Sequence, residues 1–163
     1  MMILRKSIAS DVKELTSIST KAFDTDVLVG GPENDGPPGY NSEGWHREMM
    51  EQNHLYTYIC EDETIVGGAV IFGRDELFVG RIFIDPKYFC RGYGIALMQD
   101  IERLFSSRMI RLDTPTWNTR TNRFNYIIIY TIFYHESSER TILLGLSAII
   151  QLESVSNTFN LTA

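Results

Sequence analysis

Three short apolar runs, separated by tight polar turns, dominate the middle of the chain and limit what it can fold into. Residues 55–60, 65–72 and 76–84 have the length and the β-branched and aromatic content of strands. The segments between them are Glu61-Asp62-Glu63-Thr64 and Gly73-Arg74-Asp75. Because linkers this short join antiparallel neighbours, we expect a three-stranded meander. Asp85-Pro86 should end its third strand, since proline lacks the donor that a ladder needs.

Helical and strand patterns flank this meander on both sides. Residues 2–6 resemble a strand, and apolar residues then recur at helical spacing from Val12 to Phe23, with Ser10 as the expected N-cap. Ser42 should cap a second helix over Glu43 to Gln52. A third helix should begin near Tyr93 and run to Phe105, before a strand over Met109 to Asp113. This order predicts one α+β domain spanning residues 1–163.

Charge and cysteine content exclude several classes of protein. The net charge of −6 argues against nonspecific nucleic-acid binding, which needs a basic surface. The uncharged stretch Thr141 to Leu152 is too short to span a bilayer, so no membrane partner is expected. Cys60 and Cys90 have no CxxC partner and the three histidines show no ligand spacing, so we expect no metal site. With no signal peptide visible, a reducing, cytoplasmic location is predicted.

The segment that joins the third meander strand to the following helix carries the clearest chemical signal. Gly92 and Gly94 allow a tight turn with no Cβ between the backbone and a ligand. A helix that begins near Tyr93 would point free backbone N–H groups at one spot, which suits a pyrophosphate. Arg91 could add a charged contact or lie in solvent, and two glycines at such a turn can also be purely structural.

This segment resembles the acetyl-CoA-binding motif of the GNAT N-acetyltransferases, Gln/Arg-x-x-Gly-x-Gly/Ala, with Arg91, Gly94 and Ala96 at the motif positions. Residues 118–124 are similar to the family's next block, Asn-x-x-Ala-x-x-Phe-Tyr, and the resemblance covers about residues 1 to 124. It implies a mixed, mostly antiparallel sheet flanked by helices. It also implies acetyl transfer from acetyl-CoA to a primary amine by direct attack. A dinucleotide fingerprint would need a third glycine and a βαβ unit, which are absent.

The family resemblance also implies a set of cofactor contacts. Backbone groups of Ile82, Phe83 and Ile84 would pair with the pantetheine, and one of their N–H groups would polarise the thioester carbonyl. The pyrophosphate would rest on the amides of the loop and the first helical turn, namely Arg91, Gly92, Tyr93, Gly94, Ile95 and Ala96. Asn118, from the second block, completes the implied set.

The proton-transfer groups stay open. The position of the glutamate base in the histone-modifying branch corresponds to Phe78 here, so Glu76, two residues earlier, is our first candidate. His46, His54 and a water relay are alternatives. The family's acid is a tyrosine directly after the phenylalanine of the second block, where this chain has Asn125. Tyr126 follows it. An echo of the family's Phe-Tyr-Glu run at residues 133–136 makes Tyr134 another candidate.

Residues 125–163 differ in composition from the rest of the chain, since their only charges are Glu136, Glu139, Arg140 and Glu153. A hairpin of residues 125–134 with 141–152 is one interpretation, and a helix over 141–152 is another. A changed reading frame would also explain this atypical tail. Uncharged strands tend to pair with other chains, so we expect a homodimer through the tail. The unmatched tail and Asn125 support a second functional hypothesis, an acyl-CoA-binding regulatory module or a catalytically impaired homologue.

The acceptor amine would lie between the loop of residues 24–41, the helix of residues 42–52 and the meander. That loop is rich in glycine and proline, and it carries the carboxylates Asp24, Asp26, Glu33 and Asp35. These carboxylates could attract a cationic amine or could simply be solvated. The sequence does not identify the acceptor.

Overall fold

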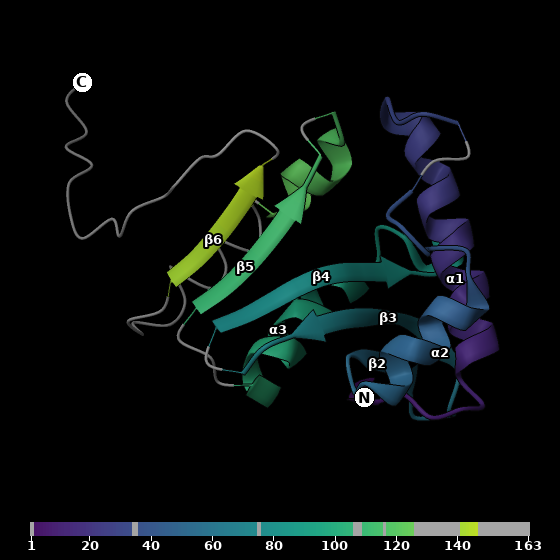
Figure 1. The fold of residues 1–163 in the computed structure, drawn as a ribbon. Helices are drawn as coiled ribbons and strands as arrows, with labels where there is room; N and C mark the ends of the chain where they lie inside the picture. The colour runs from purple at the N-terminus through teal and green to yellow at the C-terminus, as the bar shows by residue number, and fades with distance from the viewer. Residues whose placement is uncertain are drawn as a thin grey trace, which may run out of the picture.

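A computed structural model describes residues 2–33, 36–74, 76–105, 109–115, 117–125 and 141–146 of the chain (Figure 1). Its elements are β1 (Met2–Lys6), α1 (Val12–Asp24), the 3-10 helix η1 (Thr25–Val29), α2 (Glu43–Glu51), β2 (Leu55–Cys60), β3 (Ile65–Phe72), β4 (Glu76–Ile84), the 3-10 turn η2 (Pro86–Tyr88), α3 (Tyr93–Phe105), β5 (Met109–Thr114) and β6 (Thr141–Leu146). A short helical stretch covers residues 119–125. The α+β class expected from the sequence is confirmed.

The six strands form one sheet in the order of the chain, β1 to β6. Neighbours from β1 to β4 are antiparallel, which confirms the meander, whereas β4–β5 and β5–β6 are parallel. Because α3 joins the parallel strands β4 and β5, the expectation that the chain lacks a βαβ unit is wrong. The pairing of β4 with β5 stops at Val79 and Leu112. Residues 81–84 of β4 are paired only with β3 in the described structure, and β4 and β5 diverge toward their C-terminal ends (Figure 1). This splay leaves the β5 side of residues 82–84 open, as the pantetheine contact implied by the family resemblance requires.

Helices cover both faces of the sheet and create two apolar layers. One layer contains Leu97, Met98 and Ile101 of α3 together with Leu77 and Val79 of β4. The other contains residues of α1 and α2 packed on strand residues that include Phe83. A register shift places Val70 opposite Arg81 but Ile71 opposite Val79, so Gly80 is the extra residue of a β-bulge. The bulge reverses the alternation of β4, and Arg81 and Phe83 therefore face α2.

Several predicted boundaries are confirmed and a few are wrong. Ser42 caps α2, because its hydroxyl accepts a hydrogen bond from Trp45 N at 3.2 Å. Ser10 does not cap α1: Asp11 occupies the N-cap position, and its carboxylate accepts bonds from Arg5 and Thr57 rather than from the first helical turn. The loop after α1 contains η1, because its glycines interrupt structure only from Gly30 onward.

The tail is described only at Asn125 and residues 141–146. The latter form β6, so the helical alternative is wrong over these residues. The strand expected over residues 126–134 lies outside the described residues, as do Tyr126 and Tyr134. Within the described ranges, no helix has the length and apolar character needed to cross a membrane.

Candidate active site

A pocket of about 770 Å³ opens where β4 and β5 separate. Residues 79–84 of β4 form one wall, and the loop before α3 forms another. Residues 112–115 and 117–125 supply most of the opposite side, and the end of α1 with Gly36 and Pro37 closes the rim. The two sequence motifs, which lie 22 residues or more apart in the chain, therefore meet in one cavity.

The two glycines of the first motif are required for different reasons. Gly92 has φ +83°, a backbone conformation that a side chain disfavours, and a Cβ there would meet nothing within 4 Å. At Gly94 a Cβ would lie 2.9 Å from Cε2 of Phe124, a residue of the second motif. The first bond of α3 runs from Ala96 N to Gly92 O at 3.0 Å. The amides of Tyr93, Gly94 and Ile95 are thus at the open end of the helix, where an anion can bind.

The structure brings most of the predicted cofactor residues to this pocket. The lining includes Ile82, Phe83, Ile84, Gly92, Tyr93, Gly94, Ile95 and Asn118. Arg91 and Ala96 do not line it. Arg91 is exposed, with its guanidinium carbon 5.8 Å from the centre of the Tyr88 ring. Ala96 packs against the core, and its amide is already used in the helix.

None of the described base candidates lines the pocket. Glu76 is exposed at the start of β4, opposite Met109, and two residues, Leu77 and Phe78, separate it from the pocket wall at Val79. His54 has Nδ1 3.0 Å from Ile71 O, and its ring lies against Phe72. His46 is fully buried, with Nδ1 2.9 Å from Ser42 O.

The position of the family's acid is occupied by a buried amide. Asn125 is 4% exposed and lines the pocket next to Phe124. An amide has no proton to give to a thiolate at neutral pH. Tyr126 and Tyr134, the two candidates for the acid, stay predictions.

An ion pair that the sequence analysis missed fixes the rim of the pocket. Arg120 donates to Oδ1 of Asp26 at 2.5 Å. Burial raises the pKa of Asp26, and the positive charge of Arg120 opposes that rise. The guanidinium carbon of Arg120 also lies 5.1 Å from the centre of the Phe89 ring. No local pattern announces the pair, because its members are 94 positions apart.

Arg81 is a second residue that the analysis missed, although an arginine within an apolar strand was a usable signal. Its side chain faces α2, with the guanidinium carbon 4.0 Å from the centre of the Trp45 ring. Its Nη2 donates to Pro38 O at 2.6 Å, and its Nη1 is buried without a partner among the described residues. Burial lowers the pKa of Arg81 to about 10.

The acidic loop contributes less free charge than its sequence suggests. Asp24 accepts a hydrogen bond from the Tyr40 hydroxyl at 3.1 Å, and Asp26 is paired with Arg120. Glu33 is exposed, and Asp35 lies outside the described residues. Two of the four carboxylates are therefore already bound within the protein.

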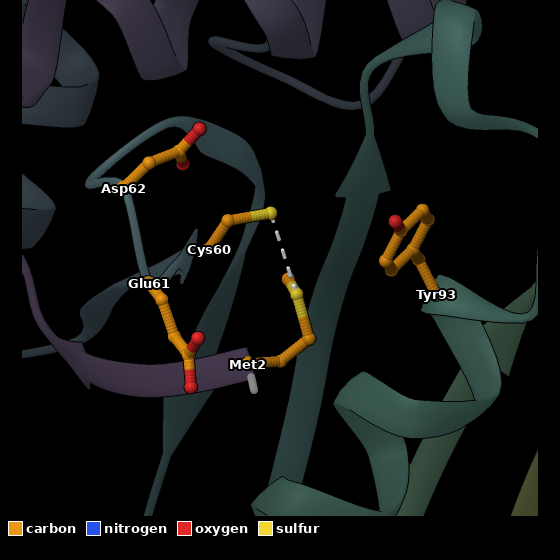
Figure 2. A pocket seen from close by; sticks show the side chains of 5 residues that line it. All are labelled: Met2, Cys60, Glu61, Asp62 and Tyr93. Carbon is orange, nitrogen blue, oxygen red and sulfur yellow. Dashed lines mark hydrogen bonds between the residues drawn. The ribbon is translucent and has the colours of Figure 1, made fainter.

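A smaller pocket of about 480 Å³ is lined by Met2, Cys60, Glu61, Asp62 and Tyr93 (Figure 2). Cys60 Sγ is 3.6 Å from Met2 Sδ, and the two sulfurs face each other in Figure 2. Among the described residues, no group of three or more His, Cys, Asp and Glu side chains is placed to hold a metal ion.

The fold, the divergence of β4 and β5 and the loop before α3 together define the architecture of an acyl-CoA N-acyltransferase. A model of the acetyltransferase (GNAT) family matches residues 14–125, and the chain belongs to this family. A search of curated protein sequences finds no match.

Solved structures share the fold at low sequence identity. A GNAT-family acetyltransferase from Streptococcus agalactiae is 15% identical, with a TM-score of 0.69 over 78% of this chain and 83% of its own. The PaiA N-acetyltransferase from Thermoplasma acidophilum, solved with coenzyme A, is 15% identical with a TM-score of 0.59 over 78% and 87%. Spermidine N-acetyltransferase from Vibrio cholerae, solved with CoA and spermine, is 11% identical with a TM-score of 0.57 over 78% and 79%.

Proposed function

We propose that this protein is an N-acetyltransferase that transfers the acetyl group of acetyl-CoA to a primary amine by direct attack. The observation that carries the proposal is the pocket at the splayed end of β4, where both family motifs meet. Acetyl transfer in general follows from membership of the family. The primary amine and the direct mechanism are the parts that need a test.

The residues present fit the cosubstrate. The open end of α3 offers the amides of Tyr93, Gly94 and Ile95 to a pyrophosphate, and Gly92 gives the turn its left-handed backbone. Residues 82–84 of β4 leave their β5-side backbone groups available to an extended pantetheine. The Oδ1 atom of Asn118 accepts a hydrogen bond from Thr121 N and so caps the following helix, and its role in this proposal is to hold the pocket wall.

In this reaction a neutral amine forms the new C–N bond as the thioester C–S bond breaks. The amine gives up one proton, and the departing thiolate takes one. A backbone N–H of β4 would stabilise the oxyanion. Because Glu76 lies outside the pocket, a water relay suits the first transfer better, and Tyr126 or Tyr134 remains the proposed source of the second proton.

A second candidate function is acyl-CoA binding without turnover. The observation that favours it is Asn125, buried in the pocket where the family has a tyrosine. Both candidates need the same cosubstrate site and differ only in proton transfer. We place either activity in the cytoplasm, since Cys60 and Cys90 are both free thiols.

Calorimetric titration with acetyl-CoA, followed by thiol release against a panel of amines, tests both. Binding with turnover supports the transferase, binding without turnover supports the second candidate, and absence of binding refutes both. A Gly92→Asp variant should lose most acetyl-CoA affinity, because its carboxylate would face the pyrophosphate. Gly92→Ala, which introduces the same backbone strain without the charge, is the matched control and should keep more of the affinity.

A further inference from the structure

The charge of Arg81 is not balanced by any carboxylate within the described residues. The side chain contacts an aromatic ring and a backbone carbonyl, and the guanidinium nitrogen Nη1 has no partner among the residues that the structure describes. Only 9% of Arg81 is exposed. A buried cation without an anionic partner is unfavourable, so such groups usually have a compensating charge. Within the described residues Arg81 therefore holds a positive charge that an anion would stabilise.

The location of this charge identifies which ligand could supply the anion. Arg81 borders the large pocket, on the face of β4 that is covered by α2. Gly36 and Pro37 line the same part of the pocket, next to the carbonyl of Pro38 that fixes the guanidinium. The motif loop, proposed to hold the pyrophosphate, follows the C-terminal end of β4 and lines the pocket at Gly92, whereas the Arg81 side chain points toward Trp45 of α2. Arg81 is thus on the side expected for the acceptor rather than for the pyrophosphate.

The orientation of the guanidinium is fixed before any ligand arrives. The Trp45 ring covers one face of the group, and Nη2 is held by Pro38 O at 2.6 Å. A guanidinium held in this way loses little side-chain entropy when it pairs with a planar anion such as a carboxylate. The other charges at the pocket are largely used, because Asp26 pairs with Arg120 and Asp113 pairs with Arg111.

We propose that the acceptor is an amine that also carries a carboxylate, an amino acid or a peptide-like acid, and that Arg81 binds this carboxylate. The inference rests on the proposed transferase function and adds the substrate class to it. It predicts that the site prefers an acceptor with a negative charge. A polyamine acceptor is the opposite case, because Arg81 would repel its cationic chain.

Bisubstrate compounds test the inference without requiring turnover. In each probe the sulfur of CoA is joined through an acetyl bridge to the amine of glycine, β-alanine or 4-aminobutanoate. Each carboxylate probe has a twin that ends in a carboxamide. We expect one chain length at which the native protein binds the carboxylate about tenfold more tightly than its twin, measured by calorimetry.

Variants assign that preference to Arg81. Arg81→Met should reduce the carboxylate-to-carboxamide ratio to about one, and Arg81→Lys should keep part of it, because the charge remains while the planar fork is lost. Arg47→Met removes an exposed cation of the same helix layer and should keep the full ratio. If Arg81→Met does not fold, the carboxylate-to-carboxamide ratios of the native protein and of Arg81→Lys still test the inference.

Two results would overturn the inference while leaving the proposed function intact. One is a native protein that binds CoA yet shows no carboxylate preference at any chain length. The other is a preference that persists in a folded Arg81→Met variant. Failure of CoA itself to bind would instead refute the transferase proposal, and the inference with it.

Discussion

The imidazole of His46 is completely buried, and the balance of its surroundings disfavours a second proton on the ring. Nδ1 lies 2.9 Å from the carbonyl of Ser42, and the ring meets the Phe83 ring edge-on at a centroid distance of 6.0 Å. Burial lowers the pKa of His46 below its usual 6.5, and the nearby charge of Arg81 lowers it further, although the Ser42 bond opposes both effects. The folded protein therefore keeps this histidine neutral.

The pH dependence of stability should report this neutral histidine. Between the folded and unfolded pKa values the unfolded chain binds one more proton, so the free energy of unfolding should fall as the pH drops below 6.5. The slope from one such group is at most about 1.4 kcal/mol per pH unit. Urea unfolding between pH 5 and pH 8 measures it.

A His46→Phe variant should lose this part of the slope while keeping the ring contact with Phe83, and His46→Gln provides a second version. Subtracting the variant's profile from the native profile removes the contributions of every other titrating group. An identical slope in native protein and variants would show that His46 is protonated alike in both states.

At the scale of elements, two of the contacts that join the helical stretch 119–125 to the rest of the domain link both of its ends to distant segments of the chain. Arg120 reaches η1 through Asp26, and the Phe124 ring occupies the space beside Gly94 at the start of α3. Both contacts lie at the pocket. The second motif therefore forms part of the pocket wall, in addition to supplying individual polar groups.

Arg120→Met should destabilise the fold in a pH-dependent way. At pH 7 the variant leaves the Asp26 carboxylate buried and without its cation, at a cost of about 1–2 kcal/mol. Below the raised pKa of Asp26 the carboxyl is neutral and most of this cost disappears. Chemical denaturation at pH 7 and at a pH below the pKa of Asp26 compares the loss of stability under the two conditions. Arg111→Met, which removes the cation of an exposed ion pair, is the control. A loss of stability equal at both pH values would mean that packing, and not charge, is what Arg120 provides.

Gly94→Ala should be destabilising because the new Cβ would lie 2.9 Å from the Phe124 ring, and we expect a cost of about 1–2 kcal/mol. In a Phe124→Leu background the ring is absent, and the same change should be neutral or slightly stabilising, since alanine favours helix over glycine. A double-mutant cycle measured by thermal unfolding isolates the coupling, expected at about 1 kcal/mol. Additive effects of the two changes would contradict the contact.

The elements that the sequence predicted well are those whose ends are set by local chemistry. The bounds of β2, β3 and β4 match because glycine, proline and acidic turn residues interrupt apolar runs there. The bulge at Gly80 and the Asp26–Arg120 pair were not predictable, since both depend on partners far along the chain. The unpredicted bulge has the largest consequence, because it turns the Arg81 side chain toward α2 and the acceptor side of the pocket.

At the scale of the whole molecule, the charge of the main pocket has the opposite sign to the net charge of the protein. The protein carries a net charge of −6, yet its main pocket is lined by Arg81, Arg120 and Arg123 against Asp26 and Asp113. A pocket with excess positive charge in an acidic protein favours entry of an anionic ligand. Coenzyme A with its phosphates and an acceptor bearing a carboxylate are both ligands of this kind, so the electrostatics of the cavity are consistent with both proposals.

The sheet ends at β6, whose outer edge is not paired with any described strand. Its sequence, Thr-Ile-Leu-Leu-Gly-Leu, contains neither the charge nor the proline with which exposed edges usually resist pairing. We therefore expect the chain to form a dimer or a larger assembly through this edge, detected by size-exclusion chromatography with light scattering. Leu143→Lys should shift the population toward monomer, whereas Leu143→Val should not, because a charge on an edge strand opposes pairing. A native protein that elutes as monomer at all concentrations would show that this edge is covered from within the chain.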